Sequence, residues 1–287
     1  MGTGGRASLS PGPKAAFIVW AAGNDDRNRV SLTIFSAQGA TKRYKSVTAI
    51  SDVSFELKKG LVYGLLGPNG SGKTTCLHLM TGLIRADGGN LVVGGIPIDD
   101  SDSRRQFGFA PDDLALPGAL TGREYLALHD GLRGRNDEER AFGLLVAFDI
   151  YGAVDRQIEE YSHGMRRKIQ IVAATMHFPA LLILDEPLRG LDPESVAVLR
   201  HAIKSLAATG RTVLIATHDI ARAQTDCDQV MILDKGSIVA EGAPQELVAE
   251  YGAGLDLEAA FFALTGRAES AREKNKMIDD TFHISER

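Results

Sequence analysis

One short motif constrains this chain more than any other part of its sequence. Residues 67–75 read Gly-Pro-Asn-Gly-Ser-Gly-Lys-Thr-Thr, which completes the pattern G-x-x-x-x-G-K-[ST]. The apolar run Leu61–Leu66 precedes the motif, and the helix-compatible stretch Cys76–Met80 follows it. A strand, a glycine-rich loop and a helix in this order form a cradle of backbone N–H groups for an anion. The motif therefore predicts that the chain binds a nucleoside triphosphate together with Mg²⁺.

The residues of this loop have separate expected tasks. Lys73 is predicted to bring positive charge to the β- and γ-phosphates and is therefore also a predicted catalytic residue. Thr74 is expected to place its hydroxyl on Mg²⁺, and Thr75 is expected to face the α-phosphate. An ordinary glycine-rich turn is the alternative, but every fixed position is filled and both flanking segments fit the motif. The other predicted nucleotide-binding residues of the loop are Gly67, Pro68, Asn69, Gly70, Ser71 and Gly72.

The 287-residue chain is long enough for one large α/β domain or two smaller ones. Its formal net charge of −5 argues against a broad nucleic-acid-binding surface, so we expect no nucleic-acid partner. Two cysteines, Cys76 and Cys227, do not make a disulfide scaffold and fit a reducing compartment. The apolar run Ala15–Ala22 is far shorter than the ~20 residues of a membrane span. Any membrane role is therefore expected to depend on a partner chain.

Segments with strand and helix patterns alternate along most of the chain. Capping boxes at Thr121–Glu124 and Asn136–Glu139 predict helices that reach about Leu132 and Phe148. A further apolar-periodic helix is predicted over Arg166–Met176. The alternation predicts an α/β fold interrupted by a helical insertion. The predicted strands are Leu32–Ala37, Val53–Leu57, Leu61–Leu66, Asn90–Val93, Phe107–Ala110, Leu181–Leu184, Thr212–Ala216, Met231–Asp234 and Ser237–Ala240.

The predicted strand Leu181–Leu184 ends in two acids, Asp185 and Glu186. Carboxylates at the carboxyl edge of a parallel sheet lie where α/β proteins bind their ligands. We expect Asp185 to hold Mg²⁺ through water, and Glu186 to orient and deprotonate the attacking water. Acids can also simply end a strand, but beside a complete phosphate loop the catalytic interpretation is favoured.

Three weaker patterns accompany these motifs. Ser162, in Tyr161–Met165, is a good N-cap for the next helix, and in isolation a capped helix would explain it. His218 follows the predicted strand Thr212–Ala216 and can reach a γ-phosphate, although a single His at a strand end is more often structural. Asp192 stands directly before Pro193. Asp is a good N-cap residue and Pro is favoured at the first helical position, so the two predict the start of a helix.

Together these motifs resemble the ATP-binding subunits of ABC transporters over residues 30–240. Their order and spacing match the family throughout, which a chance arrangement would not produce. The matching segments are the Walker A motif Gly67–Thr75, the signature Tyr161–Met165, the Walker B motif Leu181–Asp185 followed by Glu186, the D-loop Gly190–Pro193 and the switch residue His218.

The resemblance implies an α/β fold with a P-loop NTPase (RecA-like) core, an antiparallel β edge and an inserted α-helical subdomain. Residues 1–30, rich in Gly, Pro and polar side chains, are predicted to be a flexible extension. Residues 267–287 are polar and charged and are predicted to be a mobile tail. Between them we expect the ATPase domain at 31–243, with its core at 31–112 and 177–243 and its helical and signature subdomain at 113–176, and then a C-terminal helical segment at 244–266.

The resemblance also implies a mechanism. Two such domains pair head to tail around two ATP molecules, and the signature of each grips the γ-phosphate bound to the other. The expected partners are a second ATPase subunit, most simply in a homodimer, and an integral membrane permease at the cytoplasmic face of the cell membrane. The residues to which this assigns roles are Ser162, His163, Gly164 and Met165 of the signature, Asp192 of the D-loop, and Tyr44, which would stack on adenine.

The chain departs from the family pattern at two places. The signature reads Tyr-Ser-His-Gly-Met where Leu-Ser-Gly-Gly-Gln is usual, a form similar to the type-2 exporter branch. Asp112 stands where the family has the Gln of its Q-loop. Asp112 is therefore an additional candidate ligand for Mg²⁺, and its charge would repel the γ-phosphate unless the metal lies between them.

Two other functions are compatible with the phosphate loop. One is a non-transport ABC ATPase acting on chromosomes or ribosomes, which the single Walker A motif and the lack of sustained heptads disfavour. The other is a weakly hydrolysing regulatory module, which Glu186 and His218 disfavour. The motifs do not specify a transported cargo.

Overall fold

The computed structural model describes residues 32–112, 115–134 and 137–283. The predicted flexible extension, residues 1–30, lies outside the described residues. The strands are β1 Thr33–Tyr44, β2 Val47–Lys58, β3 Val62–Leu66, β4 Gly88–Val93, β5 Ile96–Pro97, β6 Phe107–Ala110, β7 Leu181–Asp185, β8 Thr212–Thr217, β9 Gln229–Asp234 and β10 Ser237–Gly242. The helices are α2 Lys73–Met80, α3 Gly122–Arg133, α4 Glu138–Ala147, α5 His163–Thr175, α6 Pro193–Ala208, α7 Ile220–Asp226, α8 Pro244–Tyr251, α9 Leu257–Thr265 and α10 Ala268–His283.

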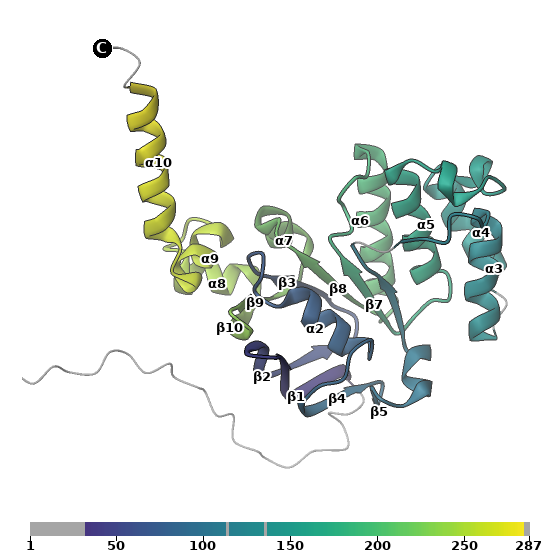
Figure 1. Cartoon of the computed structure of the whole chain (residues 1–287), viewed down its shortest axis with the longest axis horizontal. Coiled ribbons are helices and arrows are strands. Elements are labelled where there is room, and N and C mark those ends of the chain that lie inside the picture. The colour runs from purple at the N-terminus through teal and green to yellow at the C-terminus, as the bar shows by residue number, and fades with distance from the viewer. Residues whose placement is uncertain (1–31, 113–114, 135–136, 284–287) are drawn as a thin grey trace, which may run out of the picture.

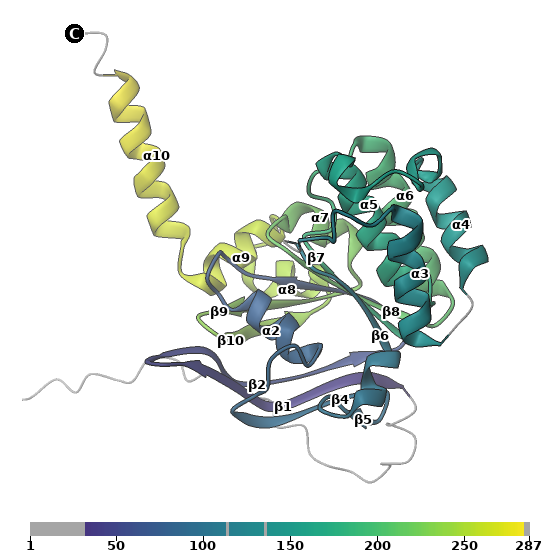
Figure 2. The ribbon, with the colours of Figure 1, turned by 45° about the vertical axis from the view of Figure 1, so that its right-hand side comes forward.

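The strands form two sheets (Figure 1). A six-stranded sheet has the order β10-β9-β3-β8-β7-β6 and is parallel except for its antiparallel edge strand β10. A four-stranded antiparallel sheet has the order β2-β1-β4-β5, and α2 lies between the two sheets (Figure 2). The predicted antiparallel edge is thus mostly a separate sheet, which covers α2 and the phosphate loop from the side opposite the parallel strands.

Strand β7 shows why the strands of the parallel sheet are unbroken apolar runs in the sequence. All five of its residues are buried, because side chains leave a strand alternately toward the two faces and both faces are covered. Leu181 and Ile183 pack in the cluster around α2, and Leu182 and Leu184 pack in the cluster under α6. The strand therefore ends, at Asp185, in the middle of a rigid layer.

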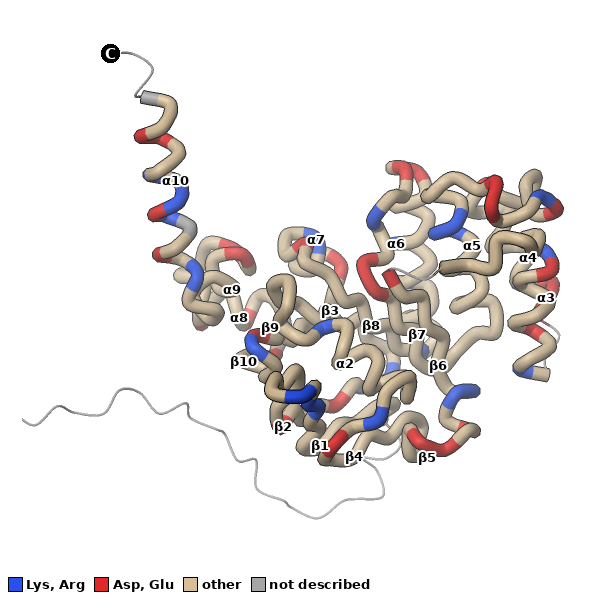
Figure 3. The backbone as a smooth tube through the Cα atoms, in the orientation of Figure 1, with Lys and Arg blue, Asp and Glu red and all other residues tan. Residues whose placement is uncertain are grey.

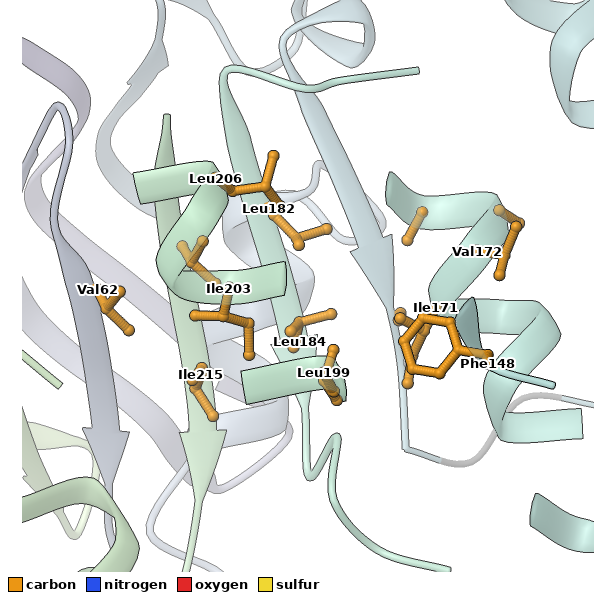
Figure 4. Close-up of a cluster of buried hydrophobic side chains, with 14 of the residues drawn as sticks. Val62, Phe148, Ile171, Val172, Leu182, Leu184, Leu199, Ile203, Leu206 and Ile215 are labelled. Atoms are coloured by element: carbon orange, nitrogen blue, oxygen red, sulfur yellow. The ribbon is translucent and has the colours of Figure 1, made fainter. Parts of the chain in front are cut away.

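Helix α6 covers the second face of the sheet (Figure 4). Asp192 caps the helix by accepting a hydrogen bond from the Ser195 N–H at 2.8 Å, as the sequence predicts. The apolar residues Leu199, Ile203 and Leu206 of the helix pack in the same buried cluster as β7 and β8. Because the helix is anchored at its first turn and along its length, the loop that precedes it is held close to the end of β7.

Two predicted capping boxes have different outcomes. The box that opens α3 is confirmed, since the Thr121 N–H donates to Glu124 at 2.8 Å and the Glu124 N–H donates to Thr121 Oγ1 at 3.2 Å. The box predicted at Asn136–Glu139 is wrong, because α4 begins at Glu138 and Asp137 occupies the cap position. Asp137 caps no N–H with its side chain, and its carboxylate pairs with Arg140 at 2.6 Å.

The first two strands are longer than the sequence pattern predicts. β1 and β2 pair over almost their whole length, but the register shifts at four places along the ladder. Each shift breaks the period-two alternation while the backbone pairing continues, so the pattern ends before the strand does. The short strand β5 at Ile96–Pro97 was not predicted, because two residues carry no periodicity.

Helix α5 lies directly against the edge strand β6. A Cβ atom placed on Gly108 of β6 would lie 1.9 Å from the backbone oxygen of Ala174 in α5, so only glycine fits at that position. The remaining helices of the insertion, α3 and α4, pack on α5 and share its buried cluster with the sheet. The helical insertion is therefore joined to the core by a continuous apolar interior.

The C-terminal part of the chain is helical. The predicted helix around 257–266 is confirmed as α9, which packs on its own domain through Leu257, Ala260 and Phe261. The segment predicted to be a mobile tail contains helix α10, which projects from the body and carries charges of both signs along its length (Figure 3). Within the described part of the chain, no helix is both long enough and apolar enough to cross a membrane.

Candidate nucleotide-binding site

The loop between β3 and α2 is shaped by glycines that no other residue could replace without strain. Gly72 has φ +108°, and a Cβ atom there would lie 2.6 Å from the Ala49 backbone oxygen. A Cβ atom on Gly67 would lie 2.4 Å from the Leu233 oxygen. The Gly236 N–H donates to the Ser71 oxygen at 2.9 Å, which fixes the loop from the other side. The loop is therefore pressed between neighbouring backbones and opens only toward the cavity above it.

Helix α2 begins at Lys73 with Gly72 as its N-cap, and no side chain caps its first turn. The N–H groups of a first helical turn lack partners within the helix, and the helix dipole adds positive potential at the same end. This end of α2 faces the cavity, so the structure presents backbone donors and the Lys73 side chain to one point. The arrangement suits a phosphate.

The Lys73 ammonium group lies within the curl of the loop. Its Nζ donates to the Gly67 oxygen at 2.6 Å and to the Pro68 oxygen at 3.3 Å. Burial lowers the pKa of Lys73, while the nearby charges of Glu186 and Asp185 act in the opposite direction. The same two carbonyls thus hold the cation at the mouth of the cradle.

Asp185 closes the opposite side of the cavity at the carboxyl end of β7. Its residue surface is only 6% exposed, and burial, followed by the charges of Asp112 and Glu186, raises its pKa to about 6. Its backbone oxygen accepts a hydrogen bond from the buried guanidinium of Arg167, which also donates to the Pro111 oxygen. Arg167 therefore ties the ends of β6 and β7 together below the site.

Glu186 and His218, which the sequence predicts to act on the same reaction, are in direct contact. The Thr217 hydroxyl donates to Glu186 Oε2 at 3.0 Å, and the His218 N–H donates to Oε1 at 2.9 Å. The Nδ1 atom of His218 lies 2.6 Å from the same Oε1. Glu186 has φ +46°, a strained backbone conformation for a residue with a side chain, which the surrounding hydrogen bonds maintain. Strained, over-determined residues of this kind cluster at functional sites.

These groups border one cavity of about 920 Å³. Its walls come from the phosphate loop, the ends of β6 and β7, the loop before α7 and the start of β2. The predicted site residues that line it are Pro68, Asn69, Gly70, Gly72, Lys73, Thr74, Thr75, Asp112, Asp185, Glu186 and His218. Gly67 and Ser71 belong to the loop itself but do not line the cavity, and Ser71 is buried beneath it.

Tyr44 is not among the residues that line this cavity. It ends β1, is 46% exposed, and its ring lies 5.7 Å from Lys42 Nζ. The residues just after it, Val47, Thr48 and Ala49, do line the cavity. Tyr44 therefore lies near the site at the exposed end of β1, and its stacking on adenine stays a prediction.

The signature residues lie apart from the cavity of their own chain. Ser162 caps α5 as predicted, by accepting a hydrogen bond from the Met165 N–H at 3.2 Å. His163 packs against Gly190, where an added Cβ would lie 2.3 Å from the His163 ring. Lys168 of the same helix pairs with Asp192 at 3.1 Å. The signature and D-loop residues thus form one surface beside the site, which suits a task on another chain.

Sequence reasoning missed two arginines at the site. Arg167 holds the ends of β6 and β7, and Arg189 pairs with Asp112 at 2.9 Å. Both follow closely on recognised motifs, Arg167 after the signature and Arg189 after the two acids of β7. Their positions inside these segments were the available signal, but a single sequence does not reveal which partner an arginine finds.

A phosphate cradle after one parallel strand, faced by carboxylates that end the next strand but one, defines a P-loop nucleoside triphosphatase. Within this class the chain matches the family model "ABC transporter" over residues 50–189. The linearmycin resistance ATP-binding protein LnrL of Bacillus subtilis (strain 168) is 36% identical over 224 residues, covering 76% of this chain and 72% of the relative. The daunorubicin/doxorubicin resistance ATP-binding protein DrrA of Streptomyces peucetius is 34% identical over 250 residues, covering 85% and 76%. The chain belongs to the ABC transporter family of ATP-binding proteins.

Solved structures agree with this assignment. A structure described as the ATP-binding subunit of an ABC transporter superposes with a TM-score of 0.78 at 30% identity, covering 81% of this chain and all of that one. A dimeric bacterial ABC transporter cassette and its post-hydrolysis state with ADP and Pi each give a TM-score of 0.68 at 25% identity, covering 73% of this chain and 98% of theirs. The chain is therefore a nucleotide-binding ATPase of this family.

Proposed function

We propose that this chain hydrolyses MgATP as a head-to-tail homodimer and thereby drives export through a separate membrane permease, at the cytoplasmic face of the cell membrane. The observation that carries the proposal is the contact between Glu186 and His218 beside the phosphate loop. Relatives named for linearmycin and daunorubicin resistance, and the Nod factor export ATP-binding protein I of Ralstonia nicotianae (34% identical; 76% of this chain, 70% of the relative), support a role in export. The cargo is set by the permease.

Magnesium fits the oxygen donors at the site. The Thr74 hydroxyl and the Asp185 carboxylate face one cavity, and hard oxygen ligands of this kind are those that Mg²⁺ prefers. A bound Mg²⁺ would neutralise phosphate charge in the reaction. Lys73 and the first-turn N–H groups of α2 would hold the phosphates in place, so the chain itself supplies orientation and positive potential.

Glu186 is proposed as the general base. Its Oε1 is fixed by the backbone N–H of His218, and its Oε2 by the Thr217 hydroxyl, so the carboxylate is held rather than free to rotate. A held carboxylate can orient a water molecule and accept its proton. His218 lies on the exposed side of Glu186, where it can reach a γ-phosphate and report its presence.

The signature surface is proposed to complete the site of a second copy. Ser162 and Gly164 stand at the N-terminus of α5, where Gly164 lies against Gly190, and neither lines the cavity of its own chain. The unpaired N–H groups of a helix N-terminus attract a phosphate. ATP would then join two copies, and its hydrolysis would separate them.

Hydrolysis by the purified chain is expected to require Mg²⁺ and to accelerate when the permease is added. Phosphate release is measured for the chain alone, with the permease in detergent or nanodiscs, and after chelation of Mg²⁺ with EDTA. Full activity in EDTA would contradict the magnesium assignment. A rate that the permease never changes would contradict coupling to transport.

The permease is proposed to dock on a groove of about 830 Å³ between α3 and α4. Phe142 and Tyr151 line it with exposed rings whose centroids lie 4.8 Å apart, and Asp130, Glu138 and Glu139 give it negative charge. An apolar segment flanked by basic residues is complementary to such a groove.

Replacing Phe142 with Glu is expected to weaken association with the permease at least ~10-fold, because the change removes a central aromatic anchor and would bury a charge against the apolar part of the docking segment. The ATPase rate of the isolated chain should not change. Association is measured with the purified permease by pull-down at defined concentrations. Leu83→Glu, a similarly exposed apolar residue outside the groove, is the matched control. Equal loss in both variants would reject the groove.

A further inference from the structure

The acid at the Q-loop position has a partner that sequence motifs do not predict. Arg189 Nη1 lies 2.9 Å from Asp112 Oδ2, with the arginine side chain 67% exposed and the aspartate side chain 27% exposed. Asp112 follows β6 at the entrance to the helical insertion, and Arg189 lies in the loop between Glu186 and Asp192. The pair therefore connects two loops that are 77 residues apart in the chain.

Both members of this pair border the nucleotide cavity. The cavity walls already contain the carboxylates of Asp185 and Glu186, and a polyphosphate would add further negative charge. An unpaired Asp112 would repel a γ-phosphate across this space, since like charges in a partly desolvated site interact strongly. The Asp112 charge acts on the site in the structure as well, since it is one of the influences that raise the pKa of Asp185.

Among the described residues, the only ion pair of the Asp112 side chain is with Arg189, although the buried Arg167 also feels the Asp112 charge. Lys73 is engaged with the Gly67 and Pro68 oxygens. The Arg167 guanidinium is buried and donates to backbone oxygens of Pro111 and Asp185. Arg189 makes the direct ion pair with the Asp112 side chain.

We propose that Arg189 is a positioning residue, which holds the Asp112 carboxylate back from the phosphates and partly offsets its charge. The inference rests on the proposed binding of MgATP in this cavity. It assigns Asp112 to an ion-pair strut between the two loops, in place of a role as Mg²⁺ ligand. The strut also links the entrance of the helical insertion to the segment that carries the D-loop Asp192.

The test compares wild type with Arg189→Ala, Asp112→Asn and the double variant. Binding of a non-hydrolysable ATP analogue and of ADP, each with Mg²⁺, is measured by isothermal titration calorimetry on the purified chain. Arg189→Ala is expected to lower the affinity for the ATP analogue about 10-fold and the affinity for ADP by no more than about 3-fold. Only the ATP analogue carries a γ-phosphate near the unpaired Asp112 carboxylate. The double variant should return to within about 3-fold of wild type, since removing the Asp112 charge removes the need for its partner.

Two further measurements separate positioning from a structural role. The unfolding midpoint of Arg189→Ala without nucleotide should change little, because an exposed ion pair contributes little to stability. Arg189→Lys should recover part of the ATP-analogue affinity, because it restores charge without the planar fork. Arg85→Ala, which removes an exposed arginine facing Asp99 away from the cavity, is the matched control and should bind like wild type.

The possible outcomes are distinct. Wild-type affinity in Arg189→Ala, or a double variant as weak as Arg189→Ala, would overturn the proposal. The proposal would also be overturned if the Asp112→Asn variant, with Arg189 present, lost its Mg²⁺-dependent affinity for the ATP analogue, because Asp112 would then be a metal ligand. A wild-type chain that binds neither nucleotide would instead remove the proposed function on which the inference rests.

Discussion

Replacement of Glu186 by Gln is expected to slow ATP hydrolysis by about 10²- to 10⁴-fold while nucleotide binding is retained, because this is the range that a positioned general base contributes. The amide has nearly the same shape as the carboxylate. Its oxygen can still accept from the His218 N–H, and the Thr217 hydroxyl can rotate to accept from the amide nitrogen. The substitution therefore removes the base and leaves the surrounding geometry in place.

Single-turnover hydrolysis and size-exclusion chromatography in MgATP measure the two consequences of this change. The Glu186→Gln variant should remain dimeric in MgATP, because the event that separates the two copies no longer occurs. Glu194→Gln, an acid in the first turn of α6 that does not line the cavity, serves as the control. A Glu186→Gln variant that hydrolyses ATP at the wild-type rate would remove Glu186 as the base.

Replacement of Gly72 by Ala is expected to abolish nucleotide binding in practice and to destabilise the fold. A side chain at φ +108° is strained, and its Cβ would lie 2.6 Å from the Ala49 oxygen, so the loop or the neighbouring strand must move. Strain of this kind costs about 1–3 kcal/mol before the clash is added. Because the shifted backbone carries the N–H groups that face the phosphate, affinity is expected to fall at least ~100-fold.

Gly70→Ala is a matched comparison for this prediction. Gly70 has φ +78°, but a Cβ atom there meets nothing within 4 Å. It therefore carries the conformational cost of a left-handed residue, about 1–2 kcal/mol, without the clash. Thermal unfolding and nucleotide titration of both variants separate the two contributions. Equal losses in the two variants would show that the contact with Ala49 does not matter.

The local part of the site was predictable because it depends on residues close together in the sequence. The phosphate loop, the two acids after β7 and the N-caps at Ser162 and Asp192 are each set by neighbours within a few positions, and all lie in the structure as expected. The strand positions were found for the same reason, since a buried parallel strand needs only a short apolar run.

The parts that the sequence did not predict depend on distant partners. The Asp112–Arg189 pair joins residues far apart in the chain, and nothing in either local sequence indicates the other. The sequence makes Asp112 a candidate metal ligand, because it occupies the position of the Q-loop Gln and carries carboxylate oxygens. The N-cap of α4 is Asp137 and not the predicted Asn136, because Asn and Asp are equally good N-cap types and the sequence does not choose between two such neighbours. The extent of β1 was underestimated because its register shifts break the alternation.

The packing of α5 on the sheet places this helix with the core, although the sequence assigns it to the helical insertion. Gly108 lets the helix lie flush on β6, and Arg167 fastens it to the ends of β6 and β7. The helical insertion predicted from the sequence spans 113–176, yet its last helix, α5, is fixed to the sheet by these contacts. Any swinging motion of the insertion would have to pivot ahead of Ser162. The surface that we propose to meet a partner's nucleotide is then held in place by the sheet, and only α3 and α4, which pack on α5, are left as parts that could tilt.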